Sequence, residues 1–269
     1  MHRFRTYHVG MLLLIAIASV GCANRVKLAE TDAAFAARLA SAGSLALGGV
    51  TVATALDAEF APEDAPDADD ALYRAFLTAR PDLVVWPAPA VGRRAGADTL
   101  AAVVAEFASY GRLRPDQVTP LAGALAECRF LVIARLSEDA ISSNAQRQDL
   151  ADPEARAEGL PEHRISLPPT VLTERAITVA LAIFDLADGS TVWQGESRSR
   201  DRARYEYRDE LGSEGTAYLQ ERLAAAGGPR RLSRRGDFLK APDLIDLIEQ
   251  ALTALVKRLP GAPDAGGAG

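Results

Sequence analysis

The sequence predicts an α/β sandwich, in which helices pack on a mixed sheet of about five strands. Between residues 45 and 136, short apolar segments alternate with amphipathic helical segments, and strands separated by helices are usually parallel neighbours. A hairpin near 174–204 then adds antiparallel strands. Apolar residues make up 48% of the 269 residues, which is enough to bury a sizeable core and excludes a generally disordered chain.

The hairpin is predicted by a turn dipeptide between two strand-like segments. Asp188-Gly189 precedes Thr191–Trp193, and Asp-Gly is typical of a tight hairpin loop because glycine adopts positive φ at no steric cost. Alternation predicts a core-facing side formed by Ile177, Val179, Leu181, Ile183 and Val192. The other, mixed side carries Thr178, Ala180, Ala182, Phe184, Thr191 and Trp193. We expect Trp193 to lie close to Phe184 on that side.

Two strands and a helix are predicted at the start of the domain. Residues 45–56 form an apolar run with strand composition, in which Gly48-Gly49 marks a bulge or the true start of the strand. Residues 69–79 predict a helix. It ends at Arg80-Pro81, because proline disfavours helical geometry in the residue before it. Residues 82–86 predict the second strand.

Helices are predicted between the second strand and a third. Residues 92–96 predict a basic loop. From Asp98 to Gly111, apolar residues recur at the i, i+3, i+4 and i+7 positions of an amphipathic helix, and residues 115–127 predict another helix. The nearly continuous apolar run in residues 129–136 predicts a strand in the interior of the sheet.

The remaining segments are polar or terminal. Residues 138–173 contain four prolines and predict a long connection of the kind that is usually functional or mobile. Residues 201–226 are charged and predict partial helix. Pro242 begins the last helix, since proline is favoured in a first turn, and residues 260–269 predict a disordered tail.

The first 21 residues predict a bacterial lipoprotein signal peptide. Arg3 and Arg5 precede an apolar run at 11–18 that is too short to span a bilayer as a stable helix. Gly21-Cys22 resembles the lipobox of bacterial lipoproteins, with Ser19 where the motif usually has leucine. The resemblance implies cleavage before Cys22, a diacylglycerol thioether on its sulfur, and an acyl chain such as palmitate on the new amino terminus. An ordinary signal peptide and an uncleaved anchor are the alternatives.

Residues 22–44 are expected to be a lipid-anchored tether with a short helix, and residues 45–259 the α/β domain. Residues 23–30 would form the tether and reach no more than roughly 30 Å when fully extended, which keeps the domain close to the membrane. Two or more acyl chains suffice for stable anchoring. In a two-membrane envelope, the resemblance to lipoproteins and the absence of aspartate at Ala23 imply the inner leaflet of the outer membrane, facing the periplasm.

The hairpin residues resemble those of a group of envelope proteins. In VALAIFDLADGSTVWQGE (179–196), an apolar strand enters an Asp-x-x-x-Gly turn and returns through Val-Trp, and the strand RFLVIARL (129–136) precedes it. Together with the lipobox, these stretches resemble the curli-secretion lipoprotein, the lipoprotein activators of penicillin-binding proteins and the amino-terminal domain of the Tol translocation protein. The resemblance implies a shared fold type and a non-enzymatic role in assembly, secretion or regulation at the envelope.

The residue types available do not favour catalysis or cofactor binding. A formal charge of −6, two units more negative once Arg3 and Arg5 are removed, argues against a nucleic-acid partner. The mature chain has a single histidine, His163, whereas zinc sites usually need several histidine or cysteine ligands. We therefore expect no cofactor, no metal and no enzymatic activity. Cys128 lies beside an apolar run and is expected to be a buried thiol.

Two features are candidates for partner binding. Trp86 ends a predicted strand, where open α/β sheets often bind ligands, and a buried core aromatic is the alternative. A basic cluster on this acidic chain can meet anionic lipid headgroups or cell-wall carboxylates, and a solvated loop is the alternative. The cluster consists of Arg230, Arg231, Arg234 and Arg235.

The sequence thus favours a lipid-anchored periplasmic lipoprotein that acts as a non-catalytic binding or scaffolding component of an envelope assembly, secretion or cell-wall regulation complex. Its expected partners are the membrane, through lipidated Cys22, and an envelope protein. The alternative is a cell-wall or glycan-acting hydrolase that uses carboxylates, for which Glu138 and Asp139 are a candidate pair. Adjacent residues of a strand point to opposite sides, so we expect this pair to be a solvated strand end instead.

Overall fold

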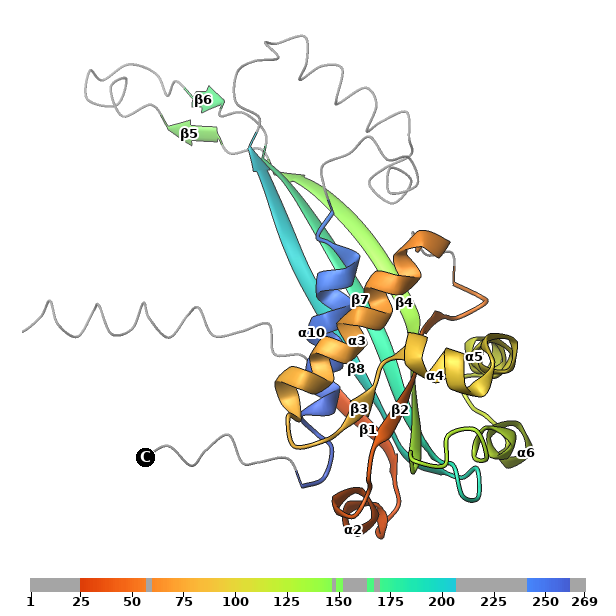
Figure 1. The fold of residues 1–269 in the computed structure, drawn as a ribbon. Coiled ribbons are helices and arrows are strands. Elements are labelled where there is room, and N and C mark those ends of the chain that lie inside the picture. Colours follow the sequence, from red (N-terminus) through yellow and green to blue (C-terminus); the bar gives the residue numbers. More distant parts are fainter. Residues whose placement is uncertain are drawn as a thin grey trace, which may run out of the picture.

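The computed structural model describes residues 25–56, 60–146, 149–151, 164–166, 170–206 and 241–261. Within these residues, helices pack on a mixed sheet, which confirms the predicted α/β class (Figure 1). The elements in chain order are β1 (Arg25–Thr31), α2 (Phe35–Ala40), β2 (Leu45–Val52), the short 3-10 turn η1 (Pro62–Asp64), α3 (Ala65–Ala79), β3 (Val85–Trp86), α4 (Ala88–Ala95), α5 (Ala97–Tyr110), α6 (Pro115–Val118), the 3-10 turn η2 (Thr119–Leu121), β4 (Phe130–Gln146), β5 (Asp149–Ala151), β6 (Arg164–Ser166), β7 (Thr170–Asp185), β8 (Thr191–Glu206) and α10 (Leu244–Val256).

The main sheet among the described residues has six strands in the order β1-β8-β7-β4-β2-β3. β3 and β4 both run parallel to β2, as expected of strands separated by helices. The pairs β4–β7, β7–β8 and β8–β1 are antiparallel, and β7 and β8 form the expected hairpin. The sheet has one strand more than predicted because β1 pairs with β8 at one edge.

β1 corrects the expectation that residues 23–30 form a tether, whereas the short helix expected after them is present as α2 (Phe35–Ala40). Residues 25–31 form an edge strand, and α2 follows from Phe35, with its first residue fully buried against the ring of Phe130. In this strand Val26 packs against the core. Pairing with β8 also satisfies backbone groups that a free tether would leave to water.

The strands of the central hairpins are longer than predicted. β4 continues to Gln146 and β7 begins at Thr170, so the predicted connection 138–173 is wrong at both ends. β8 continues to Glu206, where partial helix was predicted from residue 201. Polar residues are compatible with these extensions because an antiparallel sheet tolerates one solvent-facing side.

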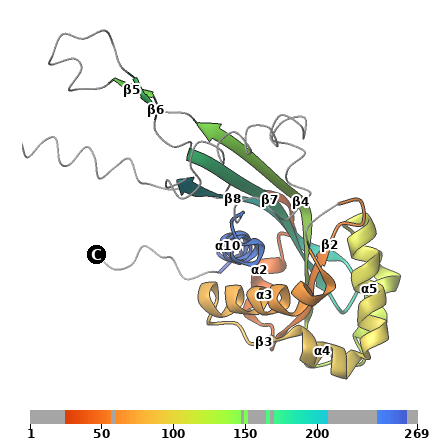
Figure 2. The ribbon, with the colours of Figure 1, turned by 90° about the horizontal axis from the view of Figure 1, so that it is seen from above.

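Two helical layers cover different parts of the sheet (Figures 1 and 2). α3 and α10 pack on one side with the inward residues of β2, β4, β7 and β8. α4, α5 and α6 belong to a second core on the other side, and in Figure 1 they lie beside the lower part of the sheet. The predicted basic loop 92–96 is wrong, since residues 92–95 lie in α4. The predicted helix 115–127 is shorter than expected, because α6 ends at Val118 and a 3-10 turn follows.

A β-bulge in the hairpin decides which core Trp193 joins. Ile183 pairs with Trp193 and Phe184 pairs with Thr191, so one residue of β8 has no opposite partner. Trp193 therefore lies with Ile183 in the core under α3 and α10, and its ring lies over Gly195, where an added Cβ would come within 2.8 Å of the ring. Phe184 faces the second core and contacts Phe107 edge-on at 5.9 Å. The expectation that Trp193 lies close to Phe184 was wrong.

The turn of the β7–β8 hairpin is fixed by its surroundings. Gly189 has φ +74°, and an added Cβ would lie 2.5 Å from the backbone of Pro115 at the start of α6. Asp185, only 1% exposed, accepts hydrogen bonds from Arg38 at 3.0 Å and Arg129 at 3.2 Å. The Asp-Gly turn is thus confirmed, and both its backbone shape and its packing require glycine.

A second bulge brings a carboxyl group of α3 to the backbone of β2. The pairing of β2 with β4 shifts between Leu47 and Gly49, and Gly49 has φ +107°. The Oδ1 atom of Asp69 accepts a hydrogen bond from the Val50 N–H at 2.7 Å. Burial raises the pKa of Asp69 to about 6, although the bond from Val50 acts in the opposite direction.

Ile183→Ala is expected to cost about 2–5 kcal/mol of unfolding free energy, because a fully buried side chain of the α3/α10 core is truncated. Urea denaturation measures the loss. Val84→Ala is the control, since Val84 is 61% exposed and should lose less than about 0.5 kcal/mol. Equal losses in the two variants would contradict the placement of this hairpin face.

Asp69→Asn is expected to flatten the pH dependence of stability between about pH 4 and pH 7. The pKa of Asp69 is raised in the folded state, so its stabilising contribution is fully present below the ordinary value of 3.8 and is lost as pH rises through about 6. Asparagine keeps an oxygen for the Val50 N–H but does not ionise. At pH 7.5 the variant should therefore be more stable than wild type by on the order of 1 kcal/mol in denaturant melts. Parallel stability curves for the two proteins would refute the assignment.

Candidate binding surface on the open face of the sheet

Four arginines line one side of β8. Arg198, Arg200, Arg202 and Arg204 alternate with smaller or acidic residues, and alternate residues of a strand share a face. All four are exposed, whereas the neighbouring Ser197 and Ser199 are buried on the opposite side. The rise of a strand places the four along roughly 20 Å. We call these four residues the arginine ladder.

The neighbouring strands extend the same surface. Arg198 pairs with Thr178, which pairs with Glu138, and the register continues outward along all three strands. In the described part of the chain, the second helical layer ends near Arg135, whose Nε donates to the carbonyl of Ala108 at 3.0 Å. We call the surface beyond that point the open face. Besides the arginine ladder it carries Glu138, Ala140, Ser142, Asn144, Leu172, Glu174, Ala176 and Thr178.

The ladder makes exposed ion pairs with two glutamates. Arg198 contacts Glu138 at 3.3 Å, and Glu138 also accepts a hydrogen bond from the Thr178 hydroxyl at 2.7 Å. Arg202 pairs with Glu174. Exposed pairs of this kind contribute only about 0–1 kcal/mol, so water or another anion competes with them easily. Within the described ranges Arg200 has no ion-pair partner.

The opposite side of the same strands is held rigidly. Arg175 of β7 donates to both carboxylate oxygens of Asp139 of β4, at 2.8 and 2.7 Å, and their side chains are 7% and 2% exposed. Arg175 also donates to the carbonyl of Pro242, just before α10, at 3.4 Å. This buried pair fixes the hairpin to the helix layer, so the open face is built on ordered strands.

Glu138 and Asp139 point to opposite faces of β4, as expected of adjacent strand residues. Glu138 lies on the open face and Asp139 under α10, so the two carboxylates do not converge on one cleft.

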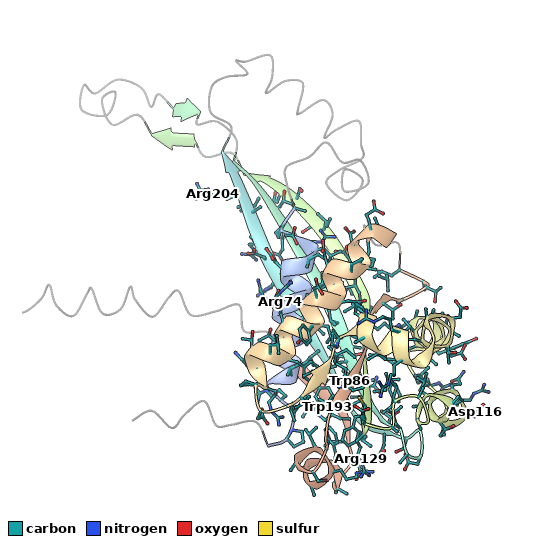
Figure 3. The ribbon with its side chains drawn as sticks, in the orientation of Figure 1. Arg74, Trp86, Asp116, Arg129, Trp193 and Arg204 are labelled. Atoms are coloured by element: carbon teal, nitrogen blue, oxygen red, sulfur yellow. The ribbon has the colours of Figure 1, made fainter. Side chains whose placement is uncertain are left out.

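Trp86 lies at the far edge of the sheet from the arginine ladder (Figure 3). It is half-buried against the second core, and the guanidinium carbon of Arg94 lies 5.3 Å from the centroid of its ring. The second core and Arg94 therefore both contact the Trp86 ring within the fold. The other candidate residues, Cys22, Arg230, Arg231, Arg234 and Arg235, lie outside the described residues.

Cys128 is buried, as expected, and its sulfur lies 3.3 Å from the Ser44 hydroxyl. Burial raises the pKa of the Cys128 thiol, which disfavours the reactive thiolate.

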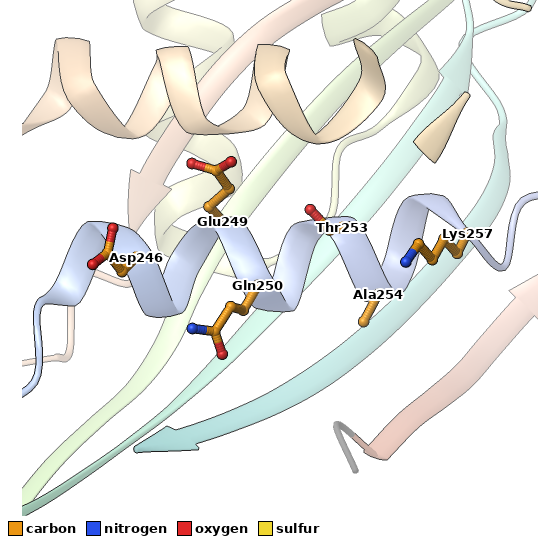
Figure 4. A pocket seen from close by; sticks show the side chains of 6 residues that line it. All are labelled: Asp246, Glu249, Gln250, Thr253, Ala254 and Lys257. Carbon is orange, nitrogen blue, oxygen red and sulfur yellow. The ribbon is translucent and has the colours of Figure 1, made fainter. Parts of the chain in front are cut away.

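A shallow depression of about 500 Å³ runs along the solvent side of α10 (Figure 4). One helix supplies its lining, and Glu249 in it is paired with Arg74 of α3 at 2.8 Å. The lining charges have mixed sign and point along the surface instead of converging, so the depression does not form a chemical site. The lining residues are Asp246, Glu249, Gln250, Thr253, Ala254 and Lys257.

In the described ranges no three histidine, cysteine, aspartate or glutamate side chains gather as metal ligands would. Among the helices described there, none combines the length and apolar character required to cross a membrane.

Comparisons with known proteins give only distant structural likenesses. No protein-family model matches the chain, and no curated protein matches it. The hypothetical protein CT253 from Chlamydia trachomatis is 16% identical with a TM-score of 0.34, over 80% of this chain and 96% of that one. The PelC dodecamer from Paraburkholderia phytofirmans is 12% identical with a TM-score of 0.30, over 75% and 96%. Lipoprotein GNA1162 from Neisseria meningitidis is 11% identical with a TM-score of 0.34, over 67% and 98%. At these values the likenesses carry no functional conclusion.

The arginine ladder was not predicted from the sequence. In the stretch SRSRDRARYE (197–206), the residues from Asp201 onward were assigned to a charged, partly helical segment on their composition. Its period of two was the signal that distinguishes a strand from a helix, because charges on one face of a helix would recur every three or four residues.

Asp139→Ala is expected to destabilise the fold by about 3 kcal/mol, because it removes a buried carboxylate from the charge of Arg175. Glu138→Ala is the matched control on the adjacent residue and should cost less than about 1 kcal/mol, since its pair with Arg198 is exposed. Denaturant melts at neutral pH compare the two. Similar losses would contradict the assignment of opposite roles to these neighbours.

Proposed function

We propose that this protein is a lipid-anchored periplasmic lipoprotein that acts as a non-catalytic binding or scaffolding component of an envelope assembly, secretion or cell-wall regulation complex. The anchor is the lipid on Cys22, and cleavage before that residue makes it the first residue of the mature chain. Ala23 after it favours the inner leaflet of the outer membrane. The proposed partner is another protein of the envelope.

The observation that carries the proposal is the short distance in sequence between the lipobox cysteine and the folded domain. β1 begins at Arg25, three residues after Cys22. Three residues span at most about 11 Å, so an acylated Cys22 would hold the sheet edge directly at the membrane surface. A domain held in this way is well placed to bind partner proteins at the membrane surface.

A binding role is supported by how the carboxylates of the domain are used. Asp139 and Asp185 are almost fully buried, and each is held by arginine in a contact that joins separate elements of the fold. The open face instead presents exposed charges on ordered strands. Exposed polar side chains on a rigid scaffold are suited to recognition.

Affinity isolation of the lipidated protein from its native membrane tests the binding role. One or more envelope proteins should co-purify with wild type at a fixed ratio. A variant in which the ladder arginines are replaced by glutamine separates partners bound through the open face from those bound elsewhere. Isolation of the protein alone, after mild crosslinking in intact cells, would count against a scaffolding role.

Cys22→Ser is expected to abolish acylation and to release the protein from the membrane fraction, because the thioether requires the cysteine sulfur. Metabolic labelling with an alkyne fatty acid and fractionation of the envelope measure both effects. Cys128→Ser is the matched control, since the buried Cys128 is the second of the two cysteines and should not affect labelling. A Cys22→Ser protein that still carries label and still requires detergent would refute the anchor.

A further inference from the structure

We propose that the arginine ladder docks the domain on the anionic phospholipid headgroups of the membrane in which it is anchored. This proposal rests on the proposed lipid anchor for the proximity of the surface to the bilayer. It adds a second, electrostatic contact that would orient the domain with its open face toward the headgroups.

The position of β1 places the anchor beside the ladder. Arg25, the first residue of β1, pairs with Arg198, the first residue of the ladder, and opposite residues in antiparallel strands lie about 5 Å apart. The three residues from Cys22 to Arg25 span at most about 11 Å. β1 runs antiparallel to β8, so β8 continues past the paired Arg25 with Arg200, Arg202 and Arg204. The lipidated residue thus lies within roughly 16 Å of the backbone at the base of the ladder.

The charge of the ladder suits phosphate headgroups. Guanidinium groups bind phosphate oxygens in a bidentate manner and keep their charge at every physiological pH. Arg200 has no ion-pair partner in the described part of the chain, and the glutamate pairs of Arg198 and Arg202 are exposed and weak. The whole chain is acidic, with a formal charge of −6, so this basic surface stands against the overall charge.

The side chains between the arginines favour headgroups over a protein partner. Stable protein interfaces usually have a desolvated core of aromatic or large aliphatic residues within a polar rim. The open face instead carries mostly small or polar residues beside its charges, namely Ala140, Ser142, Asn144, Ala176 and Thr178, and Leu172 is the large aliphatic residue among those named. A surface of small residues and long cations matches an array of hydrated phosphates, and the short link to Cys22 keeps those phosphates at high effective concentration.

Vesicle co-sedimentation tests the proposal without the lipid anchor. The protein is the mature polypeptide 22–269 with Cys22→Ser, which retains every described element from β1 to α10. The probes are vesicles of phosphatidylcholine alone and of equimolar phosphatidylcholine and phosphatidylglycerol.

The ladder variant replaces Arg198, Arg200, Arg202 and Arg204 with glutamine. The charge-matched control replaces Arg93, Arg94, Arg112 and Arg114, which are exposed on the helical side. A third variant with Arg230, Arg231, Arg234 and Arg235 replaced by serine tests the basic cluster separately.

Wild type is expected to bind the anionic vesicles and not the neutral ones, and to lose binding as salt is added, because exposed charges are screened over roughly 8 Å at physiological ionic strength. The ladder variant should bind the anionic vesicles at least about tenfold more weakly, and the control variant within about twofold of wild type. Thermal melts of all variants should agree, which shows that the loss is not due to unfolding.

Equal binding by the ladder and control variants overturns the proposal, as does equal binding of wild type to the two kinds of vesicle. Wild type that ignores anionic vesicles but captures an acidic envelope protein through the same arginines also overturns it, because the open face would then serve a protein. The lipid anchor is tested separately, by measuring acylation of Cys22 in the full chain. The vesicle test does not depend on that acylation, because it uses the unlipidated Cys22→Ser form.

Discussion

The strict alternation of side chains along β7 and β8 is the constraint on which the rest of the structure depends. Near the turn, one side of the hairpin must fit the α3/α10 core and the other the core of α4, α5 and α6, so both sides are apolar. Further along, the helices described on the second side end, and that side becomes charged while the first stays buried. The bulge at the start of β8 sets the phase of this pattern, since without it the arginines would point into the core.

The two ion-pair systems of the hairpin have different physical roles. Asp139 with Arg175 is desolvated, so its value lies in the geometry that it enforces between strands and α10. Glu138 with Arg198, one residue away, is solvated and contributes little to stability. The same short stretch of β4 therefore contains a buried structural contact on one side of the sheet and an exposed contact that a ligand can replace on the other.

Much of this fold was predictable from local signals, and the errors have physical causes. Three elements were predicted from signals that act within a few residues. Asp188-Gly189 indicated the hairpin, an apolar run indicated the interior strand β4, and Pro242-Asp243 indicated the last helix. Asp243 caps α10 by accepting hydrogen bonds from two backbone N–H groups.

β1 was missed because an edge strand is stabilised by pairing with β8, which local sequence does not reveal. Trp193 was misplaced because a single-residue bulge reverses the facing of every residue after it. The arginine ladder was missed because composition was given more weight than period, although its period was visible.

The closed turn at Gly189 also limits how this hairpin can change during evolution. Pro115 lies against the turn, and the residue there must have positive φ, so an inserted residue would have to displace the start of α6. Homologous chains are therefore expected to keep a constant loop length at this end. Differences in hairpin length should accumulate at the other end of β7 and β8, so related proteins would vary in how far their strands extend beyond the helices while conserving the turn.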